Sequence, residues 1–310
     1  DVWASWGSAR GVDPATRLPL DDWRTFLLSM NHLAEYARFA GYNCIQPTVV
    51  GQGGAMYPSA LLDANYRLDS GFVADSAPDP MRKDAVELLL RICQRNRLGV
   101  VPSLRLDGAI VALDRKGTEV GPQSSGLLLV SREGQVWDGQ IASSLHPGRR
   151  YNPLNSNVQD AVLGVVREFV QRYGTHPAFE ALALDLATQS HVVLPGLDWG
   201  YDDQTVAEFV RETGIEPVPI VKDDPARFAQ RFHWLTTTAR DQWIAWRCRK
   251  LATFYEAMLA EVQQAKPAGR LIVNLTTLSG LGSEDPRDAA RPSRTIEESL
   301  RARGIDLRNW

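Results

Sequence analysis

Short apolar runs alternate with amphipathic stretches along this chain, and this alternation limits most strongly how it can fold. Apolar residues follow a helical period over residues 22–40, 83–97, 158–170 and 235–265. Between these stretches lie continuous apolar runs, at residues 42–50, 98–106, 179–186 and 271–276. Such runs are typical of strands covered on both faces. Strands that alternate with helices predict a parallel sheet with right-handed crossovers. Weaker patterns predict a first strand at residues 2–6 and short helices at 203–213 and 294–303.

Two architectures satisfy this alternation: a doubly wound sheet and a (β/α)8 barrel. A doubly wound sheet would place a glycine-rich phosphate turn after a strand. Residues 51–54 are the candidate, but they lack the GxGxxG spacing and no helix begins at once after them. A barrel has long loops at the carboxyl ends of its strands, and we expect long loops at residues 51–82, 107–152 and 187–202. We therefore predict an α/β fold of the TIM-type (β/α)8 barrel class.

The number of visible strands is low for a closed barrel. About five strands are recognisable, and a sixth starts near Ile305. The barrel is therefore expected to be incomplete or irregular within these 310 residues. Because no linker divides the chain, we predict a single domain over residues 1–310, with a long loop excursion at about 107–152. We also allow that this domain is part of a longer natural protein.

Charge and composition argue against several classes of function. The chain has 34 basic and 37 acidic residues, so no electrostatic case exists for a nucleic-acid partner. No apolar run is long enough to insert into a membrane. The 3 cysteines are widely spaced and no paired-histidine motif is present, so we expect buried free thiols, no metal site and no cofactor. The chain does not begin with Met; if a signal peptide was removed, a periplasmic or extracellular location is favoured.

Several short motifs resemble one family. Tyr42-Asn43-Cys44-Ile45-Gln46 leads to Gly54-Ala55-Met56-Tyr57-Pro58-Ser59, and Asn152-Pro153-Leu154 opens a helix. Trp243-Ile244-Ala245-Trp246-Arg247 and Gly304-Ile305-Asp306 continue the pattern. These motifs are similar to those of glycoside-hydrolase-like family 10, bacterial (β/α)8 barrels related to clan A glycosidases. The resemblance spans roughly residues 40–306 and implies a barrel that acts on carbohydrate.

The chain departs from clan A at the catalytic positions. That clan places an Asn-Glu pair at the end of the fourth strand, whereas the corresponding strand here ends Leu184-Asp185-Leu186. Catalytic carboxylates must then come from other strand ends, because glycoside hydrolysis needs two carboxyl groups facing one sugar. We predict Asp185 as the acid/base, with Asp107 or Glu284 as its partner. The alternatives are an ion pair of Asp185 with Arg105, a turn at Asp107 and an exposed loop charge at Glu284.

Aromatic and polar residues near the predicted strand ends are candidates for sugar binding. Flat rings bind the apolar faces of sugars, and polar neighbours bind the hydroxyl groups. The predicted sugar-binding residues are Gln46, Tyr57, Arg105, His191, Trp199, Tyr201 and Asn274. Trp137 lies in the long excursion and is a further aromatic candidate. The alternative for the rings is packing of a loop onto the barrel, and for the polar residues a satisfied internal network.

Three classes of function remain on these grounds. The first is a glycoside hydrolase acting on a polysaccharide or oligosaccharide by carboxylate acid/base catalysis. The second is a non-catalytic carbohydrate-binding barrel within a larger protein, because the Asn-Glu pair is missing. The third is a barrel enzyme with phosphate-bearing substrates, although the strands that usually supply that site are not visible. No GxSxG motif is present, which argues against an α/β-hydrolase triad.

Overall fold

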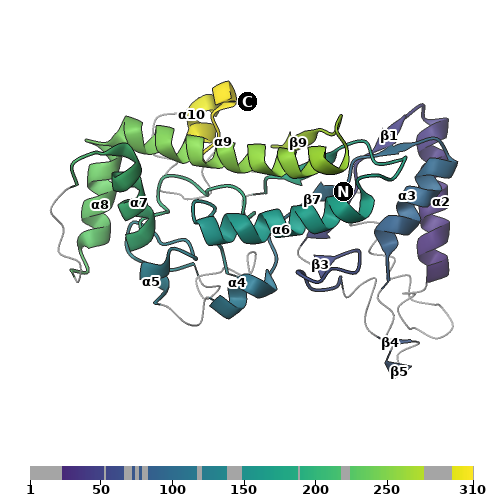
Figure 1. The fold of residues 1–310 in the computed structure, drawn as a ribbon, viewed down its shortest axis with the longest axis horizontal. Coiled ribbons are helices and arrows are strands. Elements are labelled where there is room, and N and C mark those ends of the chain that lie inside the picture. Colours follow the sequence, from purple (N-terminus) through teal and green to yellow (C-terminus); the bar gives the residue numbers. More distant parts are fainter. Residues whose placement is uncertain are drawn as a thin grey trace. The chain divides into compact units, whose positions relative to one another are not determined.

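The computed structural model describes residues 23–51, 54–65, 72–73, 77–78, 83–116, 121–137, 149–187, 189–217, 224–275 and 295–309 (Figure 1). These residues form two compact units. The first unit contains the described residues up to Gly108, together with Val165–Asp185 and Leu259–Asn274. The second unit contains Ala109–Gly164, Leu186–Met258 and the described residues that follow. The predicted single-domain organisation stays a prediction. Glu284 and the predicted strand at residues 2–6 lie outside the described residues.

A sheet forms the centre of the first unit. Its strands are β2 (Thr48–Gly51), β3 (Gly54–Ala55), β7 (Ser103–Leu104), β8 (Leu182–Asp185) and β9 (Leu271–Asn274), in the spatial order β3-β2-β7-β8-β9. Within this sheet β2, β7, β8 and β9 are parallel, and β3 pairs antiparallel with β2. The predicted α/β class with a parallel sheet is therefore confirmed.

Proline residues interrupt the first two predicted strands. Pro47 separates β1 (Cys44–Ile45) from β2, and Pro102 separates β6 (Gly99–Val100) from β7. The strands β1 and β6 pair in parallel as a separate two-stranded sheet. A proline has no N–H to donate to a ladder, but its carbonyl still accepts. Accordingly, the N–H of Ser103 donates to the Pro47 carbonyl at 2.7 Å, so the two segments of the chain stay paired across the break.

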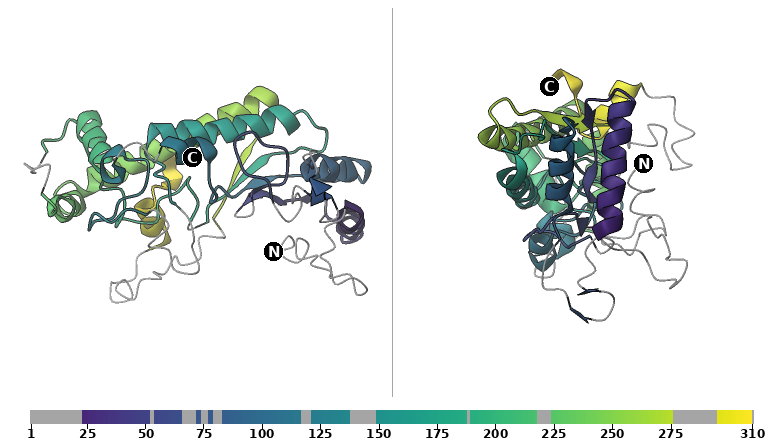
Figure 2. Two further views of the ribbon diagram at one scale, coloured as in Figure 1. Left: turned by 90° about the horizontal axis from the view of Figure 1, so that it is seen from below. Right: turned by 90° about the vertical axis from the view of Figure 1, so that its right-hand side faces the viewer.

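Two amphipathic helices complete the described N-terminal part of the first unit. They are α2 (Trp23–Phe39) and α3 (Ala85–Arg95), which lie side by side (Figures 1 and 2). The side chain of Asp84 caps α3 by accepting from the N–H of Glu87 at 2.9 Å. Arg95 donates to Asn31 of α2 at 2.6 Å. A short antiparallel pair, β4 (Phe72–Val73) and β5 (Ala77–Pro78), lies between α2 and α3 in the sequence.

Two long helices follow the expected apolar stripes. The helix α6 (Ser156–Tyr173) buries its predicted stripe, and the Asn155 side chain caps it by accepting from the N–H of Asn157 at 2.9 Å. The helix α9 (Arg240–Ala265) buries Trp243 and Trp246. One helix was predicted for residues 235–265, but the chain breaks there and forms the separate helix α8 (Arg227–Thr236).

The other helices of the second unit are short. The predicted excursion at 107–152 contains α4 (Val111–Lys116), α5 (Pro122–Ser125) and isolated bridges of Leu128 to Tyr151 and Val130 to Val136. The helix α7 (Asp203–Thr213) has the predicted bounds, and Gly214 ends it with a φ of 66°. The helix α10 (Ile296–Ala302) and the 3-10 turn η1 (Leu307–Asn309) close the described chain.

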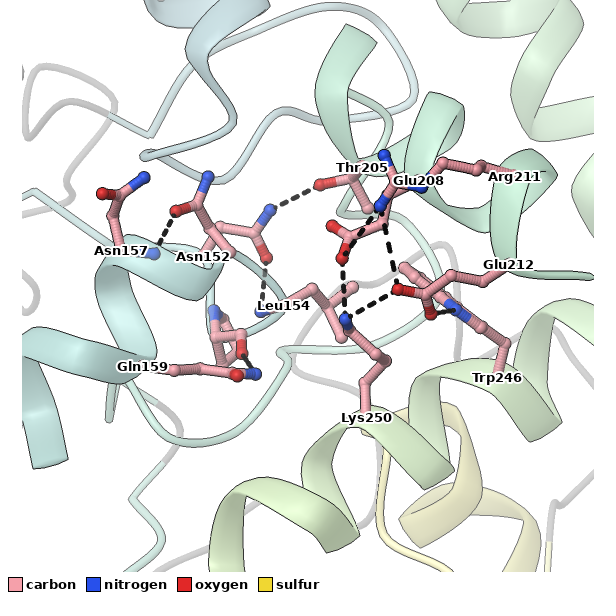
Figure 3. Close-up of polar contacts among 12 residues, drawn as sticks. Asn152, Leu154, Asn157, Gln159, Thr205, Glu208, Arg211, Glu212, Trp246 and Lys250 are labelled. Atoms are coloured by element: carbon pink, nitrogen blue, oxygen red, sulfur yellow. Dashed lines mark hydrogen bonds and ion pairs between the residues drawn. The ribbon is translucent and has the colours of Figure 1, made fainter. Parts of the chain in front are cut away.

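Polar side chains hold the start of α6 and the helices around it (Figure 3). Asn152 donates to the Thr205 hydroxyl at 2.8 Å and accepts from the N–H of Leu154 at 3.1 Å. Lys250 of α9 lies between Glu208 and Glu212 of α7, at 2.7 and 3.2 Å. The contacts of Asn152 give the Asn152-Pro153-Leu154 motif a structural role, because they fix the turn from which α6 begins.

Candidate active site

Three polar residues meet at the carboxyl edge of the parallel sheet. Asp185 is the last residue of β8, Asn274 is the last residue of β9, and the two are paired in register. Arg105 follows directly after β7. Its Nη2 donates to Asp185 Oδ2 at 3.2 Å, and Asn274 Nδ2 lies 3.4 Å from Asp185 Oδ1. The carboxyl ends of parallel strands are where α/β proteins build their sites. The structure therefore brings three predicted site residues into one cluster.

The backbone of the sheet fixes Arg105 and Asp185 in place. The N–H of Arg105 donates to the Val50 carbonyl at 2.9 Å, which continues the β2–β7 ladder by one step. The Asp185 side chain is 8% exposed and that of Arg105 is 29% exposed. The guanidinium therefore compensates a buried negative charge while part of it still faces solvent.

Asp107 is a second acidic residue at this edge, two positions after Arg105. Both of its carboxyl oxygens are buried, and neither has a hydrogen-bond partner in the described part of the chain. The pKa of Asp107 is raised to about 6, chiefly by burial and also by the negative charge of Asp185, and Arg105 opposes the rise. A carboxyl group with this pKa holds its proton at mildly acidic pH.

The two carboxyl groups therefore have unlike surroundings. Asp185 has a cation and an amide within hydrogen-bond reach, whereas Asp107 has neither among the described residues. Unlike environments of this kind give two carboxyl groups different chemical roles. At mildly acidic pH Asp107 offers a proton at the same sheet edge as the Asp185 carboxyl group that Arg105 contacts.

The remaining predicted residues of the first unit lie elsewhere. Gln46 is exposed at the break between β1 and β2. Tyr57 is 1% exposed, and its ring packs against Phe169 and Tyr173 at centroid distances of 5.3 and 5.8 Å. Its hydroxyl donates to Glu168 at 3.2 Å. Such a buried ring offers no face to a sugar, so we assign Tyr57 to packing and leave it out of the proposed site.

In the second unit the predicted aromatic residues have different exposures. Tyr201 is fully buried, and its hydroxyl donates to the Leu197 carbonyl, so its place is also in packing. Trp199 is half-buried, and its ring lies 4.7 Å from that of Trp137. We call Trp137 and Trp199 the tryptophan pair. His191 is 1% exposed, and its ring lies 4.7 Å from that of Tyr151.

Several buried polar residues of the second unit escaped the sequence analysis. Among them are Arg150 and Ser190, which are 2% and 0% exposed. Nothing in their local sequence signals burial, because tertiary packing of segments far apart in the chain covers them.

Among the described residues, no group of three His, Cys, Asp or Glu side chains is placed to hold a metal ion. No helix in the described ranges has the length and apolar character needed to cross a bilayer.

The comparisons with known proteins identify the family. The family model described as Glycosyl hydrolase-like 10 matches residues 24–277. The chain belongs to this family. The family predicted from the sequence motifs is therefore confirmed, and the prediction of a glycosidase agrees with it. A search of curated proteins gives no significant match.

The chain is similar to several solved structures of glycosidases. The glycoside hydrolase domain of PgaB (BpsB) from Bordetella bronchiseptica is 14% identical with a TM-score of 0.55, and the match covers 91% of this chain and 68% of that chain. The catalytic domain of β-amylase from Paenibacillus polymyxa is 10% identical with a TM-score of 0.49, over 79% and 62%. The α-L-fucosidase isoenzyme 2 from Paenibacillus thiaminolyticus is 16% identical with a TM-score of 0.45, over 79% and 29%.

The chain is shorter than several of these structures. It covers 29% of the fucosidase and 34% of a β-galactosidase from the psychrophilic Marinomonas ef1, which is 13% identical with a TM-score of 0.46 over 79% of this chain. The likeness to the PgaB domain shows a shared fold. Activity has to be argued from the site itself.

Proposed function

We propose that this chain is a glycoside hydrolase that cleaves a polysaccharide or oligosaccharide by carboxylate acid/base catalysis. The observation that carries the proposal is the contrast between Asp107 and Asp185 at one edge of the sheet. One carboxyl group is buried with a pKa raised to about 6, and the other is paired with Arg105 at 3.2 Å. Glycoside hydrolysis requires two carboxyl groups, one of which holds its proton at the working pH.

We further propose that the sheet belongs to a (β/α)8 barrel. The parallel strands β2, β7, β8 and β9 are spatial neighbours in the same order as they occur in the sequence. Sequential order is the arrangement of a barrel, whereas a doubly wound sheet reverses its order at a switch point. The likeness to the PgaB glycoside hydrolase domain supports this reading.

The surroundings of the two carboxyl groups suggest their roles. Asp107 holds the proton that passes to the glycosidic oxygen as the bond to the anomeric carbon breaks. Asp185 is the carboxylate that acts on the anomeric carbon, either directly or through a water molecule. Water supplies the hydroxyl group of the new reducing end, and its proton returns the carboxyl groups to their starting states. This assignment exchanges the roles predicted from the sequence, where Asp185 was the acid/base.

Arg105 and Asn274 act on Asp185 in this scheme. Both were predicted to bind sugar, and both donate to the Asp185 carboxylate. We assign them as positioning residues that hold Asp185 in one orientation. We assign sugar binding in the second unit to the tryptophan pair, because half-buried rings keep a ring face on which a pyranose can pack. The roles of Gln46, His191 and Glu284 stay predictions from the sequence.

The test is release of reducing ends from a broad panel of polysaccharides. We expect release by the wild type and a loss of about 100-fold or more in both Asp107→Asn and Asp185→Asn. Asp241→Asn is the matched control, because that carboxylate is 97% exposed on α9, and it should retain wild-type activity. Binding of a polysaccharide without any release would contradict the proposal and support a non-catalytic carbohydrate-binding barrel.

A further inference from the structure

Arg150 is a buried cation of the second unit that the proposed reaction does not use. Its side chain is 2% exposed, and its Nη2 donates to the carbonyls of Val193 and Ser190 at 3.0 and 3.5 Å. Its guanidinium carbon lies 5.1 Å from the centroid of the Trp137 ring. Carbonyl groups satisfy part of its hydrogen-bonding capacity but supply no negative charge.

Two of the three guanidinium nitrogens of Arg150 lack an acceptor among the residues that the structure describes. Nε and Nη1 of Arg150 are buried without a hydrogen-bond partner in the described part of the chain. The hydroxyl group of Ser190, whose carbonyl Arg150 contacts, is buried without a partner as well. A buried polar group left without a partner is unfavourable, and more so when the group is charged. Both residues therefore carry buried donors that lack an acceptor in the described part of the chain, and the Ser190 carbonyl joins them through Arg150 Nη2.

The electrostatic surroundings of Arg150 also indicate a missing anion. No carboxylate pairs with it among the described residues, whereas Arg149, the residue before it, pairs with Asp114 at 3.1 Å. Burial, together with the positive charge of Arg303, lowers the pKa of Arg150 to about 9. A buried cation beside a second cation is unfavourable, and an anion would relieve both the desolvation and the repulsion.

We propose that Arg150 and Ser190 form a binding site for the carboxylate of an acidic sugar. A carboxylate accepts hydrogen bonds from a guanidinium and a hydroxyl group, and it supplies the missing negative charge. The tryptophan pair indicates a sugar as the carrier of that carboxylate, because the Trp137 ring contacts the guanidinium and also belongs to the half-buried pair. This inference goes beyond the proposed function, because it assigns the second unit a binding site of its own for an anionic saccharide.

The test is calorimetric titration with trigalacturonate, cellotriose and sodium sulfate as separate probes. We expect trigalacturonate to bind the wild type at least about tenfold more tightly than either of the other two. Ser190→Ala should weaken trigalacturonate binding about tenfold. Its melting temperature should not fall, because the hydroxyl group that it removes has no partner in the structure.

Two arginine variants complete the design. Arg150→Lys keeps the charge but loses the planar fork, and we expect it to weaken trigalacturonate binding about tenfold or more. Arg149→Gln is the matched control, because Arg149 is exposed and adjacent in sequence, and it should bind as the wild type does. Equal affinity for cellotriose, sulfate binding that matches or exceeds that of trigalacturonate, or unchanged binding in Ser190→Ala would overturn the inference.

Binding is measured without turnover, so this inference and the proposed function can fail separately. Hydrolysis of neutral polysaccharides by a protein that does not bind trigalacturonate would overturn the inference and leave the proposed function intact. Binding of trigalacturonate with the predicted effects of Ser190→Ala, by a protein that hydrolyses nothing in the panel, would overturn the proposed function and leave the site intact.

Discussion

Asp185 ends β8 and Asp107 lies shortly after the neighbouring strand β7, yet each side chain has a different set of neighbours. Arg105 forms an ion pair with Asp185, whereas at Asp107 it only opposes the rise in the pKa. The same cation therefore interacts more closely with Asp185 than with Asp107. A buried carboxyl group without a partner lowers stability at neutral pH. Groups of this kind are retained where the chemistry needs them.

Asp107 should make the stability of the protein depend on pH. Its pKa is raised from 3.8 to about 6 on folding. The contribution of the protonated group to the free energy of unfolding is therefore fully present below about pH 4 and is lost as the pH rises through 6. Asp107→Asn removes this loss. We expect the variant to be more stable than the wild type by about 1–3 kcal/mol at neutral pH, and no more stable than the wild type below pH 4.

Chemical denaturation of both proteins across this pH range measures the difference. Asp241→Asn serves as the control, because its exposed carboxylate should give no difference at any pH. A constant difference between Asp107→Asn and the wild type from pH 4 to neutral pH would mean that Asp107 ionises normally.

The pair of Arg105 and Asp185 should show strong coupling. Arg105→Met leaves the buried Asp185 carboxylate without its cation, and we expect a loss of about 1–3 kcal/mol in the free energy of unfolding. Adding Asp185→Asn should recover part of that loss, since no charge then needs compensation. A double-mutant cycle by denaturation measures the coupling, and additive effects of the two changes would show that the ion pair contributes nothing.

At the scale of elements, the most accurate sequence predictions rest on local chemistry. The bounds of α7 were predicted correctly because an N-capping aspartate and a glycine at φ 66° mark its ends. The break between α8 and α9 was not predicted. There Thr236 and Thr237 donate to the carbonyls of Phe232 and His233, which competes with the continuing helix.

The cap of α7 provides a test at this scale. Asp202 is fully buried, and it accepts from the N–H of Thr205 at 2.8 Å and from Asn152 at 3.2 Å. We expect Asp202→Ala to lower the free energy of unfolding by about 1–2 kcal/mol or more, because Thr205 and Asn152 lose an acceptor. Asp202→Asn keeps an acceptor and should lose less. Equal losses measured by thermal denaturation would show that the cap does not stabilise α7.

For the whole molecule, the alternation of strands and helices was enough to predict the parallel sheet. The rule that sites lie at carboxyl strand ends was the basis for proposing Asp185, Asp107, Arg105 and Asn274 as site residues, and their roles stay predictions. The sequence could not show which aromatic residues are buried. Tyr57 and Tyr201 lie in packing because α6 and α9 supply their neighbours from distant parts of the chain. The burial of Arg150 has the same origin in tertiary packing.

The most direct test of the central claim is the pH dependence of kcat/KM on a polysaccharide that the wild type cleaves. If Asp107 donates the proton, kcat/KM should fall about tenfold for each pH unit above about 6, because the group must be protonated to act. Asp107→Asn should lose this limb of the profile together with about 100-fold of activity. A wild-type profile that stays flat from pH 5 to 8, or an Asp107→Asn variant with the full profile and rate, would contradict the account.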